Sequence, residues 1–243
     1  MASAQTLVVH QYQVSPFAAK VRRCLYYKGI PFDVVNYGLT DVGKVRKLST
    51  AGKAPVLEHD GRMIADSSDI ILHLEQCFPE RPLLPSDAAD KALAHVFEDW
   101  ADESLYYYDL TMRSWPNNAD WLSHDLVLED AGVMKRLFHY LAPKIIAKQA
   151  RDQGTGRKSH DSVCEDVGRH FDAIDKLVTA RDWLVGDTVG IADISVVSML
   201  TVLDRAEEAR DMMAKLPALR EWRARVDAAT LPEGTPDTDK ALV

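Results

Sequence analysis

The chain has 243 residues, of which 47% are hydrophobic and 27% are charged, and its 37 acidic side chains outnumber its 29 lysines and arginines. This composition supplies enough apolar material for one or two globular domains, and the formal net charge of −8 argues against nucleic acid as a partner. The longest apolar stretch, 191–203, is shorter than the roughly 20 residues that a membrane-spanning helix needs. We therefore expect neither a nucleic-acid-binding protein nor a membrane protein.

The start of the chain and its cysteines both favour a cytoplasmic location. Residues 1–10 lead directly into an apolar strand, without the basic region and longer apolar block of a secretory signal. Cys24, Cys77 and Cys164 are odd in number and form no Cys-x-x-Cys pair, so we expect neither disulfides nor zinc. The histidines form no recognisable cluster, and the acidic run at 98–103 is interpreted as a solvated helix face rather than a metal site.

The first 80 residues alternate between strand and helix signals. Strands are expected at 6–10, 32–37, 54–59 and 62–64, and helices at 16–28 and 66–78. Ser15-Pro16 begins the first helix, and Gly29 ends it. Asp60-Gly61 joins the last two strands as a hairpin. The order of elements is therefore β-α-β followed by β-β-α.

Three prolines between residues 79 and 85 end this pattern, and long amphipathic stretches follow. Helices are expected at 88–113, 119–150, 162–180, 191–207 and 217–229. The predicted fold is an α/β domain followed by an all-α helical domain. We place the first domain at 5–79, a linker at 80–87, the helical domain at 88–229 and a flexible tail at 230–243.

Ser15-Pro16 has a structural interpretation and a functional one. Serine is a preferred helix N-cap because it accepts a backbone N–H, and proline fits the first helical position. The same helix start offers unpaired N–H groups and the positive end of the helix dipole. A thiolate beside the Ser15 hydroxyl would therefore be stabilised.

Two further segments of the first domain are open to both kinds of interpretation. Ala54-Pro55 is either an ordinary trans-proline at an edge strand or a cis-proline whose preceding residue exposes its backbone to a peptide-like ligand. Asp66-Ser67 either caps the following helix or holds a ligand. In the second case Ser67 and the helix N–H groups would bind a carboxylate, and Asp66 would pair with an α-amino group.

Taken together and in this order, these segments resemble the cytosolic glutathione transferases. The resemblance is carried by Ser15-Pro16-Phe17-Ala18-Ala19-Lys20, Lys28-Gly29-Ile30-Pro31-Phe32, Gly52-Lys53-Ala54-Pro55-Val56-Leu57 and Asp66-Ser67, and in the second half by Trp183-Leu184-Val185-Gly186-Asp187 and Ile191-Ala192-Asp193. It covers essentially the whole chain. It implies a thioredoxin-like N-terminal domain, an all-helical C-terminal domain and a homodimer.

The resemblance also implies roles for individual residues. In the serine-type classes, the tau class among them, the serine of a Ser-Pro-Phe motif hydrogen-bonds the glutathione sulfur, and Ser15 holds that position here. Tyrosine-type classes place a tyrosine near the end of the first strand, so Tyr12 is the alternative thiol activator. Relatives that exchange disulfides have Cys where this chain has Ser15. Cys24 lies nine residues further on, too deep in the helix to replace it.

The rest of the glutathione site follows from the same resemblance. Lys53 would reach the glycyl carboxylate, and Ala54, before Pro55, would pair with the glutathione backbone. Asp66 and Ser67 would hold the γ-glutamyl end. Two departures stand out: Asp66 is one methylene shorter than the Glu or Gln of many classes, and Gly190 takes the place of a Ser or Thr helix cap. Glutathione is the implied co-substrate, and no metal is implied.

The electrophile site is expected between the domains. Its candidates are Tyr12, Phe17, Tyr106, Tyr107, Tyr108, Met112 and Trp115, of which Tyr108, Met112 and Trp115 are favoured in the helical domain. Consecutive tyrosines point in different directions on a helix, so only one or two can line the site, and the others would be core or interface.

The predicted function is transfer of glutathione to a small hydrophobic electrophile, or reduction of a peroxide with it. Two alternatives have the same first domain. One is a non-catalytic glutathione-binding or regulatory protein, because fold alone does not determine activity. The other is a glutathione-dependent isomerase or dehalogenase.

Overall fold

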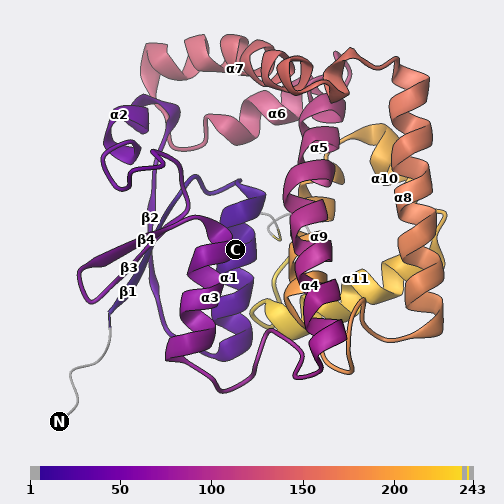
Figure 1. Cartoon of the computed structure of the whole chain (residues 1–243). Coiled ribbons are helices and arrows are strands. Elements are labelled where there is room, and N and C mark those ends of the chain that lie inside the picture. Colours follow the sequence, from indigo (N-terminus) through magenta and orange to yellow (C-terminus); the bar gives the residue numbers. More distant parts are fainter. Residues whose placement is uncertain (1–5, 237–239, 241–243) are drawn as a thin grey trace.

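The computed structural model describes residues 6–236 and residue 240. Its N-terminal part is a four-stranded sheet with helices packed on the side that faces the helical domain (Figure 1). The strands are β1 (Leu7–Gln11), β2 (Asp33–Asn36), β3 (Val56–His59) and β4 (Arg62–Ala65), in the spatial order β2-β1-β3-β4. β1 pairs with β2 in parallel and with β3 antiparallel, and β3 pairs with β4 antiparallel. The predicted β-α-β and β-β-α units therefore share one sheet.

Two helices separate the sheet from the second domain: α1 (Pro16–Lys28), which connects β1 to β2, and α3 (Ser67–Cys77), which follows β4 (Figure 1). α1 ends at Gly29, as predicted. Between β2 and β3 lie the 3₁₀ turn η1 (Leu39–Asp41) and the short helix α2 (Val42–Val45). The apolar side chain that holds this region is Val45, which is buried.

The second domain is all-helical, with more breaks than the amphipathic pattern predicts. Its elements are α4 (Ala88–Trp100), the π-helical segment η2 (Ala101–Leu105), α5 (Tyr106–Arg113), α6 (Ala119–Leu126), α7 (Gly132–Gln153), the 3₁₀ turn η3 (Thr155–Arg157), α8 (His160–Ala180), α9 (Ile191–Leu203), α10 (Glu207–Met213) and α11 (Pro217–Thr230). The single helix expected at 119–150 is two helices, and the second begins at Gly132 with a positive φ of 60°. Left-handed backbone of this kind interrupts a right-handed helix.

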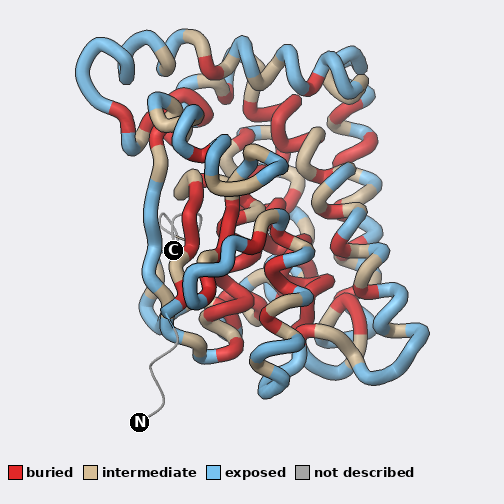
Figure 2. The backbone as a smooth tube through the Cα atoms, turned by 60° about the vertical axis from the view of Figure 1, so that its left-hand side comes forward, coloured by how far each residue is buried: buried red, intermediate tan, exposed pale blue. Residues whose placement is uncertain are grey.

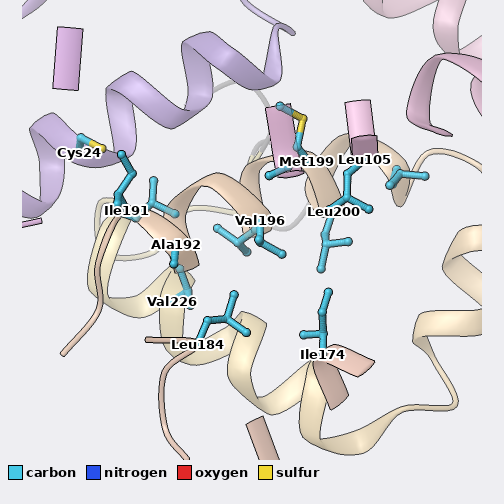
Figure 3. Packing of buried hydrophobic residues seen from close by; sticks show 14 of the residues in the cluster. Cys24, Leu105, Ile174, Leu184, Ile191, Ala192, Val196, Met199, Leu200 and Val226 are labelled. Atoms are coloured by element: carbon cyan, nitrogen blue, oxygen red, sulfur yellow. The ribbon is translucent and has the colours of Figure 1, made fainter. Parts of the chain in front are cut away.

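Helix α9 forms the centre of the molecule. All of its residues are buried, and it packs against α1 from the first domain and against α4, α5 and α11 from the second. Figure 3 shows Ile191, Ala192, Val196, Met199 and Leu200 of α9 surrounded by apolar side chains from both domains. Figure 2 shows the buried backbone concentrated in this inner region. A helix that is apolar on every side requires such surroundings.

The start of α9 depends on one buried carboxylate. Asp193 accepts hydrogen bonds from the Leu184 amide at 2.9 Å, the Gly190 amide at 3.2 Å and Trp222 Nε1 at 2.8 Å. Gly190, which departs from the family pattern, lies against the chain that joins the domains. A Cβ at this position would come within 2.8 Å of the Leu83 carbonyl oxygen, so a Ser or Thr cap does not fit here.

The two domains are also joined by buried ion pairs from α1. Lys20 Nζ lies 2.9 Å from Glu98 and 2.5 Å from Asp102, and Arg23 Nη2 lies 2.8 Å from Asp227. The prediction that the acidic run at 98–103 is a solvated face is therefore wrong for Glu98 and Asp102. These residues are four apart, so they share the helix face that turns toward α1.

The tail predicted at 230–243 begins with the last residue of α11 and lies partly outside the described residues. Within its described part, Lys240 Nζ is 2.8 Å from Asp227 Oδ2. None of the helices formed by the described residues is both long and apolar enough to span a membrane.

Candidate active site

A cavity of about 600 Å³ lies between the sheet domain and the helical domain. From the sheet domain, its lining includes eight residues predicted from the sequence to form the glutathione or electrophile site: Tyr12, Ser15, Phe17, Lys53, Ala54, Pro55, Asp66 and Ser67. They come from the β1–α1 connection, the loop before β3 and the start of α3. The fold therefore brings both helix starts and the loop before β3 to one cavity.

Ser15 is the N-cap of α1 and is half-buried. Its Oγ accepts a hydrogen bond from the Ala18 amide at 3.4 Å, and its own amide donates to the Tyr12 carbonyl at 3.0 Å. The segment before it is held by the buried Arg22, which donates to Gln11 Oε1 at 2.5 Å and to the Gln13 carbonyl at 3.3 Å. The Ser15 hydroxyl is thus placed at the positive end of α1, beside the cavity.

Tyr12 also lines the cavity, but its electrostatic surroundings differ from those of Ser15. Burial raises the pKa of Tyr12, and the carboxylates of Asp41 and Asp130 add to the rise while Arg46 opposes it. Asp130 is fixed in this position because it accepts hydrogen bonds from the amides of Leu39 and Thr40. A thiolate beside Tyr12 would meet these two negative charges and the positive charge of Arg46.

The segment at 53–55 enters the cavity just before β3. The Ala54–Pro55 peptide bond is cis, so the cis alternative of the sequence prediction is confirmed. Pro55 is buried, whereas Lys53 is exposed at the mouth of the cavity. The backbone of Ala54 and the cationic side chain of Lys53 therefore line the cavity next to each other.

Asp66 and Ser67 form the second helix start in the cavity. Asp66 Oδ1 accepts a hydrogen bond from the Ser68 amide at 2.9 Å, so it caps α3. Its φ of 76° is unusual for a residue other than glycine, and backbone of this kind is concentrated at ligand sites. Ser67 is the first residue of α3 and is buried.

The carboxylates of Glu98 and Asp102 lie next to this helix start and are called the acidic wall below. Their part in the site was not predicted from the sequence. Ser68 Oγ donates to Glu98, which shares Lys20 with Asp102. Burial raises the pKa of Asp102 to about 6 against the effect of Lys20, and Glu98 and Asp66 add to the rise. Oδ1 of Asp102 is buried without a hydrogen-bond partner within the described structure. The spacing of Glu98 and Asp102 was the available signal, since it places both on one helix face.

The other end of the cavity combines apolar and charged side chains, with Arg113, Asp125 and Glu129 among the charged ones. Its apolar part, called the apolar end below, is lined by Tyr106, Tyr107, Leu110, Leu122, Leu126, Leu128 and Ile146. The ring of Tyr106 meets that of Phe17 edge to face, with centroids 4.8 Å apart, so this end adjoins the Ser15 helix start. Burial raises the pKa of Tyr106 to about 12, which keeps its hydroxyl neutral.

The three favoured helical-domain candidates lie outside the lining of this cavity. Tyr108 is buried and donates to Asp166 at 2.9 Å, Met112 is in the core, and Trp115 stacks near His160 with centroids 4.3 Å apart. Residues 108, 112 and 115 follow one helical face, whereas 106, 110 and 113 follow the face that lines the cavity. The favoured candidates therefore lie on a different face of the helix from the residues that line this cavity.

Comparison with known proteins places this geometry in a family. The model of the glutathione S-transferase N-terminal domain matches residues 9–82, and that of the C-terminal domain matches residues 148–225. The isoprene-epoxide–glutathione S-transferase of Rhodococcus sp. (strain AD45) is 27% identical over 197 residues, which are 77% of this chain and 79% of that protein. Glutathione S-transferase U3 of Arabidopsis thaliana is 24% identical over 237 residues, 94% and 88% of the two chains.

Solved structures have the same fold. A glutathione S-transferase of Methylobacterium radiotolerans, in complex with glutathione sulfonate, is 22% identical and covers 98% of this chain and 94% of its own, with a TM-score of 0.62. The two domain models together match more than half of the 243 residues, in the order that the fold requires. The chain therefore belongs to the glutathione S-transferase family of enzymes.

Proposed function

We propose that this protein is a serine-type glutathione transferase that activates the glutathione thiol at Ser15. The observation that carries the proposal is the meeting of Ser15, Lys53, the cis Ala54–Pro55 bond and the Asp66-Ser67 helix start in one cavity. Glutathione is a thiol with two carboxylates and one ammonium group. The cavity offers a hydroxyl at a helix start, a lysine, a second helix start and an acidic wall, which match these four groups.

The activation required of Ser15 is modest. A free thiol with a pKa of about 8.5 is mostly protonated near neutrality, and lowering the pKa by about 2 units requires about 2.7 kcal/mol. One hydroxyl donor to a charged sulfur contributes about 1.5–3 kcal/mol, and a helix N-terminus contributes about 0.3–1 kcal/mol. Ser15 and the start of α1 are therefore sufficient together. The negative charges near Tyr12 favour Ser15 over it as the activating residue.

The rest of glutathione follows the lining of the cavity. Lys53 binds the glycyl carboxylate, and the backbone of Ala54 pairs with the peptide of glutathione. Ser67 and the amides at the start of α3 bind the γ-glutamyl carboxylate. Asp66 binds the ammonium group, and Asp102 of the acidic wall adds negative charge on the same side. This second carboxylate compensates for the short side chain of Asp66.

The apolar end of the cavity receives the electrophile. Its aliphatic and aromatic lining suits a small hydrophobic molecule, and a relative is named for its action on isoprene epoxide. We therefore take small apolar epoxides as the first class to test. The thiolate attacks an epoxide carbon, the carbon–oxygen bond breaks, and the resulting alkoxide takes a proton from solvent. Reduction of peroxides uses the same thiolate and is the second class in the substrate panel.

Titration of the bound thiol tests the proposal. Glutathione binding is measured by calorimetry, and the thiolate absorbance of the complex is followed against pH in wild type, Ser15→Ala and Tyr12→Phe. We expect Ser15→Ala to raise the thiol pKa and to lower kcat/KM by roughly 10- to 100-fold, the equivalent of a lost hydrogen bond to a charged group. Tyr12→Phe should leave the thiol pKa close to that of wild type.

The outcomes separate the alternatives. If glutathione does not bind to the wild-type protein, both the enzyme and its site assignment are wrong. Binding without turnover of epoxides, peroxides, isomerase substrates or haloalkanes would indicate the non-catalytic binding protein. A loss of thiolate in Tyr12→Phe rather than in Ser15→Ala would reassign the activating role to Tyr12.

We also propose a homodimer through the outer face of α4. Leu93 and Val96 are exposed there, and the neighbouring surface has a hollow lined in part by Asp99, Trp100 and Tyr108. Sedimentation equilibrium should give twice the chain mass of 27.2 kDa. Val96→Glu places a charge in the apolar patch and should shift the protein toward monomer. A wild-type protein of single-chain mass at micromolar concentration would contradict this assignment.

A further inference from the structure

A group of potential metal ligands lies away from the cavity, in the sheet domain. His59 is the last residue of β3, and His73 and Cys77 are on successive turns of α3. The potential ligand atoms of these three residues all lie within 4.8 Å of one another. The prediction that the histidines form no cluster is therefore wrong. The four-residue spacing of His73 and Cys77 was overlooked, and the proximity of His59 depends on the packing of α3 against β3.

The distances fit a small transition-metal ion. His59 Nδ1 is 2.8 Å from His73 Nε2, and His73 Nε2 is 3.7 Å from Cys77 Sγ. In a tetrahedral zinc site with Zn–N of about 2.0–2.1 Å and Zn–S of about 2.3 Å, neighbouring ligand atoms are roughly 3.3–3.6 Å apart. Each of the two distances therefore differs from the value for a bound ion by about half an ångström or less.

The environment of His59 is compatible with an ion bound at its Nδ1. Only 8% of His59 is exposed, and its Nε2 is buried without a hydrogen-bond partner within the described structure. Asp60 Oδ2 lies 3.8 Å from this nitrogen. A metal-binding histidine usually gives its second ring N–H to a carboxylate, which fixes the tautomer and the ring orientation. Because Nδ1 of His59 faces His73, its Nε2–H is on the side of the ring that faces Asp60.

The surroundings of the group agree with this arrangement. The ring of Phe78 stacks on His59, with centroids 5.7 Å apart, and shields one side of the group. Cys77 is exposed, which leaves an entry path for an ion and room for a water ligand.

We propose that His59, His73 and Cys77 bind one zinc-class divalent ion, with water as the fourth ligand. Two imidazoles and a thiolate select borderline and soft ions and reject magnesium and calcium, which require oxygen ligands. β3 and α3 both begin at the glutathione cavity, and the three ligands lie at their other ends. Along α3 the separation from Ser67 to Cys77 is about 15 Å. The bound ion joins the end of β3 to the end of α3 and does not take part in the thiol chemistry.

Zinc and cobalt binding to the full-length protein test this proposal. Zn²⁺ affinity is measured by competition with a chromogenic chelator, in a buffer free of glutathione because glutathione itself binds zinc. We expect one ion per chain, with at least tenfold weaker binding in His73→Asn and in Cys77→Ser. Co²⁺ should give a thiolate-to-metal charge-transfer band that Cys77→Ser removes. Zn²⁺ should also raise the Tm of wild type more than that of either variant.

The chain contains a matched control. His160 and Cys164 have the same four-residue spacing on α8, but among the described residues they belong to no three-ligand group of this kind. His160→Asn and Cys164→Ser should therefore leave zinc affinity unchanged. Equal weakening by the two pairs of variants, or wild-type affinity in the His73→Asn/Cys77→Ser double variant, would overturn the proposal. Ser15→Ala should bind zinc like wild type, so this result is independent of the glutathione assignment.

Discussion

Ser15 and Asp66 each begin a helix and line the cavity at the same time. Capping and ligand binding are compatible in Ser15 because a hydroxyl has two acceptor lone pairs and one donor hydrogen. The amide of Ala18, at 3.4 Å, uses an acceptor, and the donor hydrogen remains for a sulfur in the cavity. In Asp66 the positive φ turns the backbone at the point where α3 begins. The side chains of Ser15 and Asp66 therefore cap their helices and line the cavity at the same time.

The raised pKa of Asp102 makes the free energy of unfolding depend on pH. Its pKa is raised from 3.8 to about 6, so the folded chain binds this proton more tightly than the unfolded chain. The stabilisation from this group is fully present below about pH 4 and is lost as the pH rises through about 6. Between pH 4 and 7, wild type should lose up to about 3 kcal/mol of unfolding free energy relative to Asp102→Asn. Urea denaturation across this range measures the difference, and parallel curves for the two proteins would contradict it.

At the scale of elements, the continuous helix formed by α4, η2 and α5 has two functions on two faces. One face brings Glu98, Asp102, Tyr106 and Leu110 to the cavity, and another buries Leu105, Tyr108 and Met112. The segment at 101–105 is π-helical, which has more residues per turn than an α-helix and shifts the faces that follow it. Face assignments extended from α4 into α5 by regular helical spacing are therefore displaced.

Truncation of two tyrosines on α5 tests which face meets the electrophile. Tyr106→Ala removes a ring from the apolar end of the cavity and should raise the KM for the electrophile roughly tenfold, with little change in the KM for glutathione. Tyr108→Ala removes a buried ring and its hydrogen bond to Asp166, so it should lower the Tm and leave the electrophile KM unchanged. Steady-state kinetics at a temperature where both variants are folded distinguish the two. The reverse pattern would return Tyr108 to the electrophile site.

At the scale of the whole molecule, the domains form one structure through α1 and α9. α1 is covered by the sheet and α3 on one side and by α9 on the other, and it places Lys20 and Arg23 where carboxylates of the helical domain meet them. The cavity lies along this same boundary. Separating the domains would therefore expose the core, break buried ion pairs and dismantle the site together.

The Arg23–Asp227 contact provides a measure of this coupling. Arg23 is fully buried and donates to Thr230 Oγ1 and Asp227 Oδ1, both at 2.8 Å. Breaking a buried pair from one side leaves an uncompensated charge, so Arg23→Ala should lose about 3 kcal/mol of unfolding free energy. The control is Arg225→Ala on α11, the helix that carries Asp227. Its contacts with the exposed Asp182, 3.9 Å to the carboxylate and 3.2 Å to the carbonyl oxygen, should contribute less than about 1 kcal/mol. Equal losses in urea denaturation would contradict the interdomain role of Arg23.

Local signals determined much of the fold and one half of the candidate site. Ser15-Pro16, Gly29 and Asp60-Gly61 act through bonds to residues a few positions away, so they predict helix ends and a hairpin wherever they occur. The strand and helix order, the fold class and membership of the glutathione S-transferase family are confirmed. The residues expected to hold glutathione do line one cavity, because they lie at the starts of elements whose order along the chain places them together.

Only the tertiary structure decided which side chains of the long helices face inward. Periodicity shows that Glu98 and Asp102 share a face, but α1 decides that this face is buried against Lys20. The packing of α5 decides that Tyr106 rather than Tyr108 meets the cavity. The meeting of His59 with His73 and Cys77 depends on the packing of α3 on the sheet. Contacts between elements distant in the sequence depend on the shapes of all the packed surfaces, which no local pattern contains.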